Sequence, residues 1–330
     1  MKAVQIARTG GSDVMDLVDI PTPTPRAGEV LVKAEAIGVN YFDTMIRAGR
    51  YRWMPKLPFV LGNEMAGRVE ATAPGVTALK PGDRVFVAGY EIGNKGGLYA
   101  EYAAVPEAAA FTLPETVDAD AATTLTNYQL AWILVHHAAR GIEPRTAVVY
   151  GTAGGVGTAL IDVARLAGAE VIAVAGGADK CAFARKRGAA HAIDHAAEDI
   201  VSRVRGLTNG RGADLVFDHV AGPQFVKGVE MLAPLGMIVS YAVLGGIPQS
   251  DLFAAMRANI EASPAVRCFT MHSYDHLPQP RREALASALE LLASGKAQPA
   301  IATRLPLHEA RKAHDLIDAR STMGKIVLKP

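Results

Sequence analysis

The sequence is poor in cysteine, with only Cys181 and Cys268 among its 330 residues. Two thiols cannot build a four-thiolate structural zinc site, and a chain of this length has enough material for hydrophobic cores without a disulfide framework. We therefore expect both cysteines to be packing residues.

An excess of charge of one sign is also missing, because the formal net charge is +1 and no basic block occurs. This gives no reason to expect a nucleic-acid or membrane partner. No apolar run reaches transmembrane length, and residues 1–5 (MKAVQ) predict a strand and not a signal peptide. A Gly-x-Ser-x-Gly elbow is absent as well, which argues against a hydrolase of that type. We expect a globular, cytoplasmic protein.

The most informative stretch is residues 146–157, which read TAVVYGTAGGVG. Its apolar run predicts a buried parallel strand, and a glycine-rich turn and an amphipathic segment follow. Gly154 and Gly157 hold the second and third glycine places of a G-x-G-x-x-G pattern, while Thr152 stands at the first. Such a turn lets backbone N–H groups hold a pyrophosphate. The predicted phosphate-binding residues are Thr152, Ala153, Gly154, Gly155 and Val156.

The end of the next predicted strand, residues 170–175, selects the cofactor. NAD sites place an acidic residue there for the ribose 2′-hydroxyl, but this chain continues as GGADK over residues 176–180. Gly176 leaves room for a 2′-phosphate, and Lys180 can neutralise it, so we predict NADPH as the cofactor. The preference inverts if Asp179, and not Gly176, lies at the strand tip.

The rest of the chain divides into two patterns. Residues 1 to about 120 are rich in short strands and turns, which predicts a small, mostly β domain. Strands and helices then alternate, which predicts an α/β fold with a doubly wound parallel sheet and the cofactor at the carboxyl ends of its strands. The predicted strands are 146–150, 170–175, 190–194, 214–218 and 236–241. The predicted helices begin near residues 155, 179, 196 and 223.

This order of domains resembles the medium-chain dehydrogenase/reductase superfamily. Three segments are similar to its zinc-free NADPH:quinone oxidoreductase (ζ-crystallin-like) branch: 38–43 (GVNYFD), 47–51 (RAGRY) and 58–64 (PFVLGNE). The resemblance implies a Rossmann domain over residues 123–270. It also implies a GroES-like catalytic domain over residues 1–122, completed by residues 271–330.

The zinc-dependent alcohol dehydrogenases of that superfamily differ at the positions that matter for a metal. They carry Cys where this chain has Asn40, and His where it has Asn63. Amides are poor replacements in a catalytic zinc site, and residues 85–105 contain no cysteine for a structural one. We therefore expect no metal. The reaction left is hydride transfer to an electron-poor acceptor, such as a quinone or an α,β-unsaturated ketone.

The resemblance also suggests candidate catalytic residues. Tyr51 matches a tyrosine that binds the carbonyl or enolate oxygen of the acceptor, where a phenol can donate a hydrogen bond or a proton. Asn40 matches a position that borders the nicotinamide, and its amide could either orient the acceptor oxygen or simply tie down a loop. Asp43 lies in the same segment, and it is as consistent with a cap for the following helix as with a residue of the site.

Four further cofactor-binding residues follow from the resemblance. Thr126 matches a threonine near the nicotinamide carboxamide, and Tyr241 lies in a segment that passes the nicotinamide ring. His195 stands where relatives flank the 2′-phosphate, so its positive charge would strengthen NADPH binding below neutral pH. Arg320 resembles a C-terminal arginine that reaches toward the cofactor.

Two other functions remain open from the sequence. An enoyl-thioester (CoA) reductase needs a basic entrance, and Arg47, Arg50, Arg52 and Lys56 lie close to Tyr51 in sequence. A non-catalytic NADPH-binding structural or sensor protein is the alternative of another class. We also expect a homodimer joined through exposed edge strands at residues 237–241 and 265–269.

Overall fold

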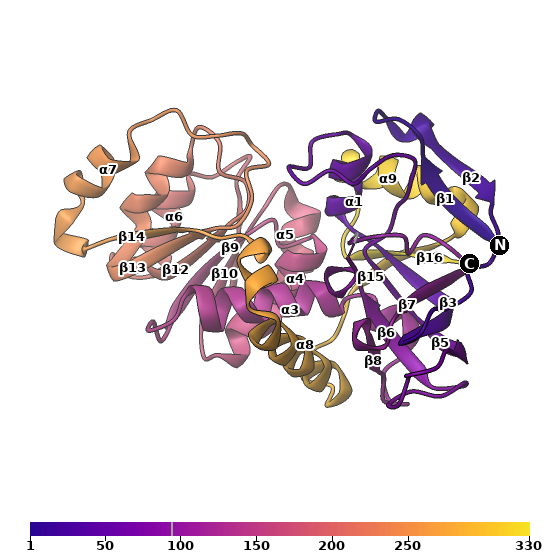
Figure 1. Cartoon of the computed structure of the whole chain (residues 1–330). Helices are drawn as coiled ribbons and strands as arrows, with labels where there is room; N and C mark the ends of the chain where they lie inside the picture. The colour runs from indigo at the N-terminus through magenta and orange to yellow at the C-terminus, as the bar shows by residue number, and fades with distance from the viewer. Residues whose placement is uncertain (94) are drawn as a thin grey trace. The chain divides into compact units, whose positions relative to one another are not determined.

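The computed structural model describes residues 1–93 and 95–330, which form two compact units. The first unit comprises Met1–Thr126, Leu292–Gly295 and Pro299–Pro330. The second unit comprises Asn127–Leu291 and Lys296–Gln298. Both chain termini belong to the first unit (Figure 1). None of the helices in the described ranges has the length and apolar character needed to span a bilayer.

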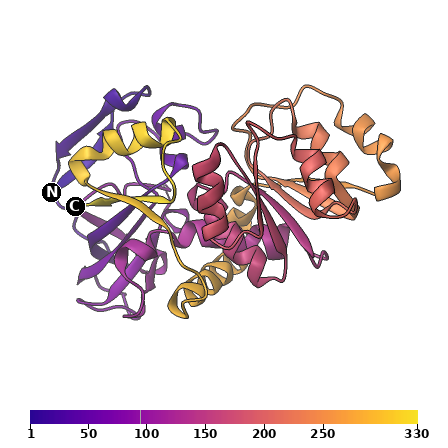
Figure 2. The ribbon, with the colours of Figure 1, turned by 180° about the vertical axis from the view of Figure 1, so that it is seen from behind.

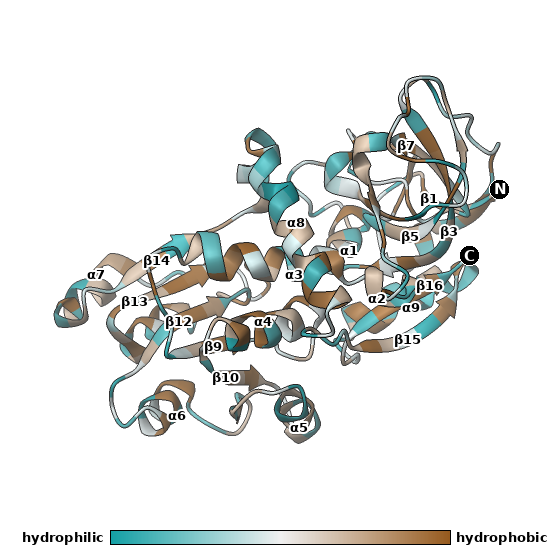
Figure 3. Ribbon diagram, turned by 90° about the horizontal axis from the view of Figure 1, so that it is seen from below, coloured by the Kyte–Doolittle hydropathy of each residue, from teal (hydrophilic) through white to brown (hydrophobic). Residues whose placement is uncertain are grey.

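The second unit is built on a six-stranded sheet in which every neighbouring pair is parallel. Its strands are β9 (Thr146–Tyr150), β10 (Glu170–Ala175), β11 (His191–Asp194), β12 (Ala213–Asp218), β13 (Leu232–Ser240) and β14 (Ala265–Cys268). The order β11-β10-β9-β12-β13-β14 reverses direction between β9 and β12, the arrangement of a doubly wound fold. The predicted fold class is confirmed. Figure 3 shows that the central strands are largely apolar, as burial on both faces requires.

One edge-strand prediction was wrong. β13, which contains residues 237–240, lies between β12 and β14 because Met237 pairs with Ala265 and Ser240 pairs with Cys268. β14 alone of the two is at the sheet edge. Cys268 is accordingly exposed, so the packing role predicted for the cysteines holds for the buried Cys181 only.

The helices of the second unit follow the predicted alternation with local differences. They are α3 (Leu125–Ile133, which starts in the first unit), α4 (Gly155–Leu166), α5 (Ala178–Lys186), α6 (Ile200–Leu207), α7 (Leu252–Ala258) and α8 (Pro278–Ala293, whose last two residues belong to the first unit). α6 begins later than predicted because Asp199 caps it, accepting a 2.8 Å hydrogen bond from the Ser202 N–H. The helix predicted near residue 223 is a 3₁₀ segment, Phe225–Met231.

The sequence predicts that the chain returns to the first unit at residue 271, but in the structure the return comes later. The segment 271–291 stays with the second unit, where Arg281 O accepts a 2.8 Å hydrogen bond from Gln129 Nε2. The Tyr274 hydroxyl is also 2.8 Å from His137 Nδ1. These contacts join α8 and the turn before it to the helical segment that starts at α3, which the hydrophobic pattern alone does not reveal.

The first unit is mostly antiparallel β structure. Its strands are β1 (Lys2–Ile6), β2 (Met15–Asp19), β3 (Glu29–Val39), β4 (Phe59–Val60), β5 (Glu64–Thr72), β6 (Arg84–Ala88), β7 (Tyr102–Pro106), β8 (Ala110–Thr112), β15 (Ile301–Pro306) and β16 (Lys325–Lys329), and its helices are α1 (Tyr41–Arg47), α2 (Ala119–Ala122) and α9 (Ala310–Asp318). The C-terminal strand β16 pairs with β3, with Ile326 opposite Val39. This register places Lys325 beside Asn40. Figures 1 and 2 show the yellow C-terminal strand next to the indigo N-terminal strands of this unit.

Candidate active site

The glycine-rich turn of the second unit lies between β9 and α4 and has the shape that a phosphate needs. A Cβ on Gly157 would lie 2.3 Å from Gly151 O, so only glycine lets the helix begin this close to the turn. A Cβ on Gly154, by contrast, would meet only Gly151 O at 3.5 Å, so the backbone there faces open space. The first-turn N–H groups of α4 add partial positive charge.

Beside this turn, Thr152 and Ala153 are buried, whereas Gly154 is exposed and Gly155 and Val156 are half-buried. Gly154, Gly155 and Val156 are therefore the accessible members of the predicted phosphate-binding set. Thr152 and Ala153 lie beneath them.

Two side chains to which the sequence assigned no role pack against the turn. Asn127 Nδ2 lies 2.3 Å from the place of a Cβ on Gly155, and His219 Cε1 lies 2.1 Å from the place of a Cβ on Gly151. The His219 ring also stacks on Tyr241, with centroids 5.5 Å apart. Tyr241 therefore lies at the carboxyl edge of the sheet near the turn. The sequence could have indicated this place for His219, because it directly follows β12 and the carboxyl ends of parallel strands meet at one edge of the sheet.

The tips of β10 and β11 bring two predicted cofactor-binding residues together. Gly176 directly follows β10, and the place of its missing Cβ is 3.0 Å from His195 Nε2. Asp179 lies in the first turn of α5 and is exposed, so it is not the tip residue. Lys180 follows it and is half-buried.

The first unit contains a network in which three polar residues surround the buried carboxylate of Glu64. Asn40 Nδ2 donates a 2.8 Å hydrogen bond to Glu64 Oε1, and the Thr126 hydroxyl donates to Glu64 Oε2. Lys325 Nζ donates to Asn40 Oδ1 at 2.6 Å and also to Glu64 Oε1. Glu64 and Lys325 are buried, while Asn40 and Thr126 are half-buried. The network thus presents one amide and one hydroxyl at its accessible side.

A second buried cluster holds the backbone of Asn40. The Asn40 N–H donates a 2.9 Å hydrogen bond to Asp43 Oδ2, as expected of a cap for α1. Tyr99 OH donates to the same oxygen at 3.1 Å and lies 3.2 Å from His314 Nε2. Burial raises the pKa of Asp43 to about 7 against the opposing effect of the Asn40 hydrogen bond. Burial, helped by the charge of Arg47, lowers the pKa of His314 to about 3.

Tyr51 belongs to an aromatic cluster on the first unit. Its ring meets Phe42 edge to face at a centroid distance of 4.6 Å and lies 5.6 Å from the ring of Trp53. Tyr90 extends the cluster, 6.2 Å from Phe42. Tyr51 is half-buried, and Trp53 is 49% exposed. A planar apolar ligand would find matching surface here.

Arg320 terminates α9, where its N–H donates to Ile317 O at 2.9 Å. Its backbone is left-handed (φ +52°) and its side chain is exposed. The loop that it begins leads to Lys325 at the start of β16.

The residues around Asn40 do not fit a catalytic zinc. The Asn63 amide is turned away, donating to Lys95 O at 3.1 Å, and the Glu64 carboxylate is paired with the Lys325 ammonium. A zinc site needs three ligands from thiolate, imidazole or carboxylate, and a neighbouring ammonium would repel the ion. Over residues 1–93 and 95–330, no group of three or more His, Cys, Asp or Glu side chains is placed to hold a metal.

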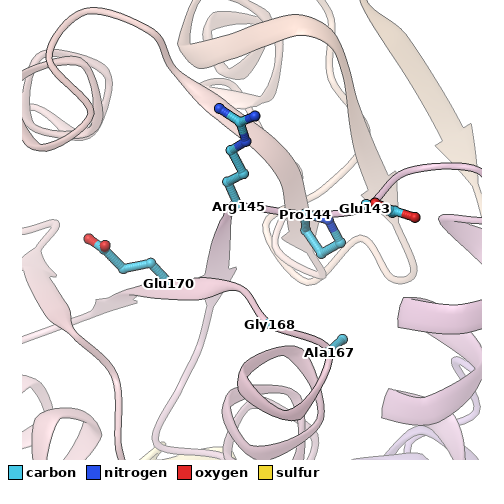
Figure 4. A pocket seen from close by; sticks show the side chains of 6 residues that line it. All are labelled: Glu143, Pro144, Arg145, Ala167, Gly168 and Glu170. Atoms are coloured by element: carbon cyan, nitrogen blue, oxygen red, sulfur yellow. The ribbon is translucent and has the colours of Figure 1, made fainter.

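A polar hollow elsewhere in the second unit is separate from this site. Figure 4 shows its lining residues, which are Glu143, Pro144, Arg145, Ala167, Gly168 and Glu170. They surround the amino ends of β9 and β10, whereas the glycine-rich turn follows the carboxyl end of β9. Ligands of doubly wound sheets bind at the carboxyl ends.

A glycine-rich turn on a doubly wound sheet and a separate β unit with its own polar network are features typical of a two-domain, dinucleotide-dependent class of enzyme. Residues 26–115 match the family model described as alcohol dehydrogenase GroES-like domain, and residues 155–293 match the one described as zinc-binding dehydrogenase.

Individual relatives narrow the class. A quinone oxidoreductase of Pseudomonas aeruginosa is 33% identical over 100% of this chain and 99% of its own length. A quinone oxidoreductase of Escherichia coli, solved in complex with NADPH, is 29% identical with a TM-score of 0.89 and full coverage of both chains. The structure of an NAD-dependent alcohol dehydrogenase is 30% identical with the same TM-score and full coverage of both chains. The chain therefore belongs to the quinone oxidoreductase family of the medium-chain dehydrogenase/reductase superfamily.

Proposed function

We propose that this protein uses NADPH to reduce quinones or other activated α,β-unsaturated carbonyls by direct hydride transfer, without zinc. The observation that carries the proposal is the network in which Asn40 and Thr126 share the Glu64 carboxylate, with Lys325 as its counter-ion. It offers neutral hydrogen-bonding groups where a zinc enzyme needs metal ligands. Such groups suit an acceptor that is already electron-poor.

Three features support NADPH as the cofactor. The open backbone at Gly154 and the start of α4 suit the pyrophosphate. Gly176 at the tip of β10 leaves room for a 2′-phosphate, with His195 beside it and Lys180 in the following helix turn. The E. coli relative was solved with NADPH. Tyr241 and Arg320 complete the set that we propose to contact the cofactor.

Bound NADPH would supply the hydride, and the protein residues would position the acceptor and handle the proton. In our proposal the Asn40 amide donates to the acceptor oxygen, and the Tyr51 hydroxyl stabilises negative charge there. The proton comes from Tyr51 or from water, so that a quinone and one hydride give the hydroquinone monoanion, and this single proton then gives the neutral hydroquinone. Thr126 accepts a hydrogen bond from the nicotinamide carboxamide.

The surroundings of Tyr51 favour a planar acceptor. Phe42, Trp53 and Tyr90 form a continuous aromatic cluster with Tyr51, and a quinone ring stacks well on such groups. Arg52 lies over the Trp53 ring, 5.7 Å from its centroid, and Lys95 over the Tyr90 ring at the same distance. These cations also keep an enoyl-thioester substrate as a second candidate, because they could meet phosphate groups of CoA.

Steady-state oxidation of NADPH with an acceptor panel tests the proposal. The panel contains 1,2- and 1,4-quinones, simple enones and a short enoyl-CoA. We expect the highest kcat/KM with quinones or enones. A preference for the enoyl-CoA would favour the thioester reductase, and tight NADPH binding without turnover of any acceptor would favour a binding protein.

We further propose that the first unit is the catalytic domain and that the second unit binds the nucleotide.

We also propose that two copies of the chain form a homodimer by pairing along β14. The position of β14 at the sheet edge supports the pairing. Sedimentation at micromolar concentration tests it, because a monomeric mass would reject the homodimer. The cytoplasmic location stays a prediction.

A further inference from the structure

The ammonium of Lys325 is enclosed in the first unit, which is an unusual place for a lysine. Its side chain is 2% exposed and that of its partner Glu64 is 0% exposed. Burying two charges costs desolvation energy that their attraction only partly returns, so a buried ion pair is weak grounds for a stabilising role. The pair therefore calls for another explanation.

The contacts of the pair determine how the Asn40 amide is turned. An ammonium can only donate, so the atom of Asn40 that lies 2.6 Å from Lys325 Nζ must be the carbonyl oxygen. A carboxylate can only accept, so the atom 2.8 Å from Glu64 Oε1 must be the amide nitrogen. Lys325 and Glu64 thus fix both the plane and the sense of the amide.

The network leaves part of the amide available. Nδ2 carries two hydrogens and donates one of them to Glu64. The second can be donated to a ligand at the accessible side of the half-buried Asn40. Because the positive and negative charges of the pair balance, its effect on a ligand acts chiefly through this orientation.

We propose that Lys325 is a positioning residue for the reduction, which aligns the Asn40 N–H with the acceptor oxygen by holding the amide carbonyl. This inference rests on the proposed function, since the contact between Asn40 and the acceptor belongs to it. Lys325 itself does not touch the substrate.

Kinetics of a double-mutant cycle test the proposal. Lys325→Met should lower kcat for quinone reduction about 10- to 100-fold, the range that a small misplacement of a reacting group can cost, while Kd for NADPH changes less than about twofold. Asn40→Ala and Asn40→Ala/Lys325→Met should have equal kcat, because Lys325 acts through Asn40. Lys329→Met serves as the control, since it removes a lysine of the same strand that pairs with Asp120. It should match the wild type.

A readout without turnover separates this inference from the proposed function. In protein labelled with ¹⁵N-asparagine, the side-chain amide signals of Asn40, assigned from their loss in Asn40→Ala, should be distinct in the wild type. They should broaden or exchange rapidly in Lys325→Met. Glu64→Gln/Lys325→Met removes the unpaired carboxylate and supplies a folded variant if the single one does not fold.

Two results would overturn the inference: unchanged Asn40 amide signals in the lysine variants, or equal kcat losses from Lys325→Met with and without Asn40. Absence of quinone turnover by the wild type, with the expected amide signals, would reject the proposed function and the link to catalysis while leaving the orienting role of Lys325 intact.

Discussion

Thr126 donates the proton of its hydroxyl to Oε2 of Glu64. A hydroxyl has one proton and two lone pairs, so this bond commits the donor and leaves the oxygen as an acceptor. Toward a ligand, Thr126 can therefore only accept. The amide NH₂ of a nicotinamide carboxamide is a suitable donor, whereas its carbonyl oxygen is not.

Replacing Thr126 with Val should weaken NADPH binding about 3- to 10-fold, the worth of one neutral hydrogen bond. Thr126→Ser should keep nearly the wild-type Kd, since it retains the oxygen. Titration of protein fluorescence with NADPH measures both constants. Equal losses for Val and Ser would mean that the methyl group, and not the hydroxyl, matters.

Replacing Lys180 with Ala should raise Kd for NADPH about 10- to 100-fold and leave Kd for NADH nearly unchanged, because a charge-assisted hydrogen bond to the 2′-phosphate contributes about 1.5–3 kcal/mol. Lys186→Ala, at the exposed far end of α5, is the matched control. Parallel losses for both nucleotides would contradict the assignment of the 2′-phosphate to this helix start.

Replacing Tyr51 with Phe should lower kcat about 100-fold, since removing one donor from a site of developing negative charge costs 10²–10³-fold. The ring remains, so its packing on Phe42 and Trp53 and the protein's melting temperature should change little. Stopped-flow measurement of NADPH oxidation gives the rate of the hydride step. A wild-type rate in the variant would leave Tyr51 a packing role only.

Replacing Asp43 with Asn should change how stability depends on pH. The folded chain keeps the Asp43 proton up to a pKa of about 7, whereas the reference pKa is 3.8. The native state therefore binds more protons in this window, and the contribution of Asp43 to the unfolding free energy falls as pH rises from about 4 to 7. Asp43→Asn has no carboxyl group at this position, so its unfolding free energy does not fall for this reason.

Urea unfolding at several pH values measures the effect. The unfolding free energy of Asp43→Asn, relative to the wild type, should rise between pH 4 and 7 and stay level above pH 7. A relative stability that is flat across the whole window would show that Asp43 titrates normally in the folded protein.

Local patterns predicted much of the fold. The apolar runs of β9 and β10 and the glycines between them give the start of the nucleotide sheet directly, because a buried parallel strand and a tight turn both have strong sequence signals. The interior place of β13 was missed because it depends on pairing with β14, and the intervening segment carries no signal for that partner.

The site was only partly predictable for the same reason. Asn40 and Thr126 could be chosen from resemblance, but the Lys325 ammonium that holds the Asn40 amide comes from the other end of the chain. In the sequence, a lysine before an apolar run, such as Lys325, is typical of the exposed start of a strand. The antiparallel pairing of β16 with β3, which the sequence does not reveal, places Lys325 beside Asn40.

The central claim is that NADPH reduces quinones at this site without a metal ion. The most direct test is the rate of NADPH oxidation by a 1,4-quinone after exhaustive chelation, with zinc in the same sample measured by mass spectrometry. Full activity with far less than one zinc per chain is the predicted result. Activity that disappears on chelation and returns with zinc, or no NADPH oxidation under any condition, would contradict the account.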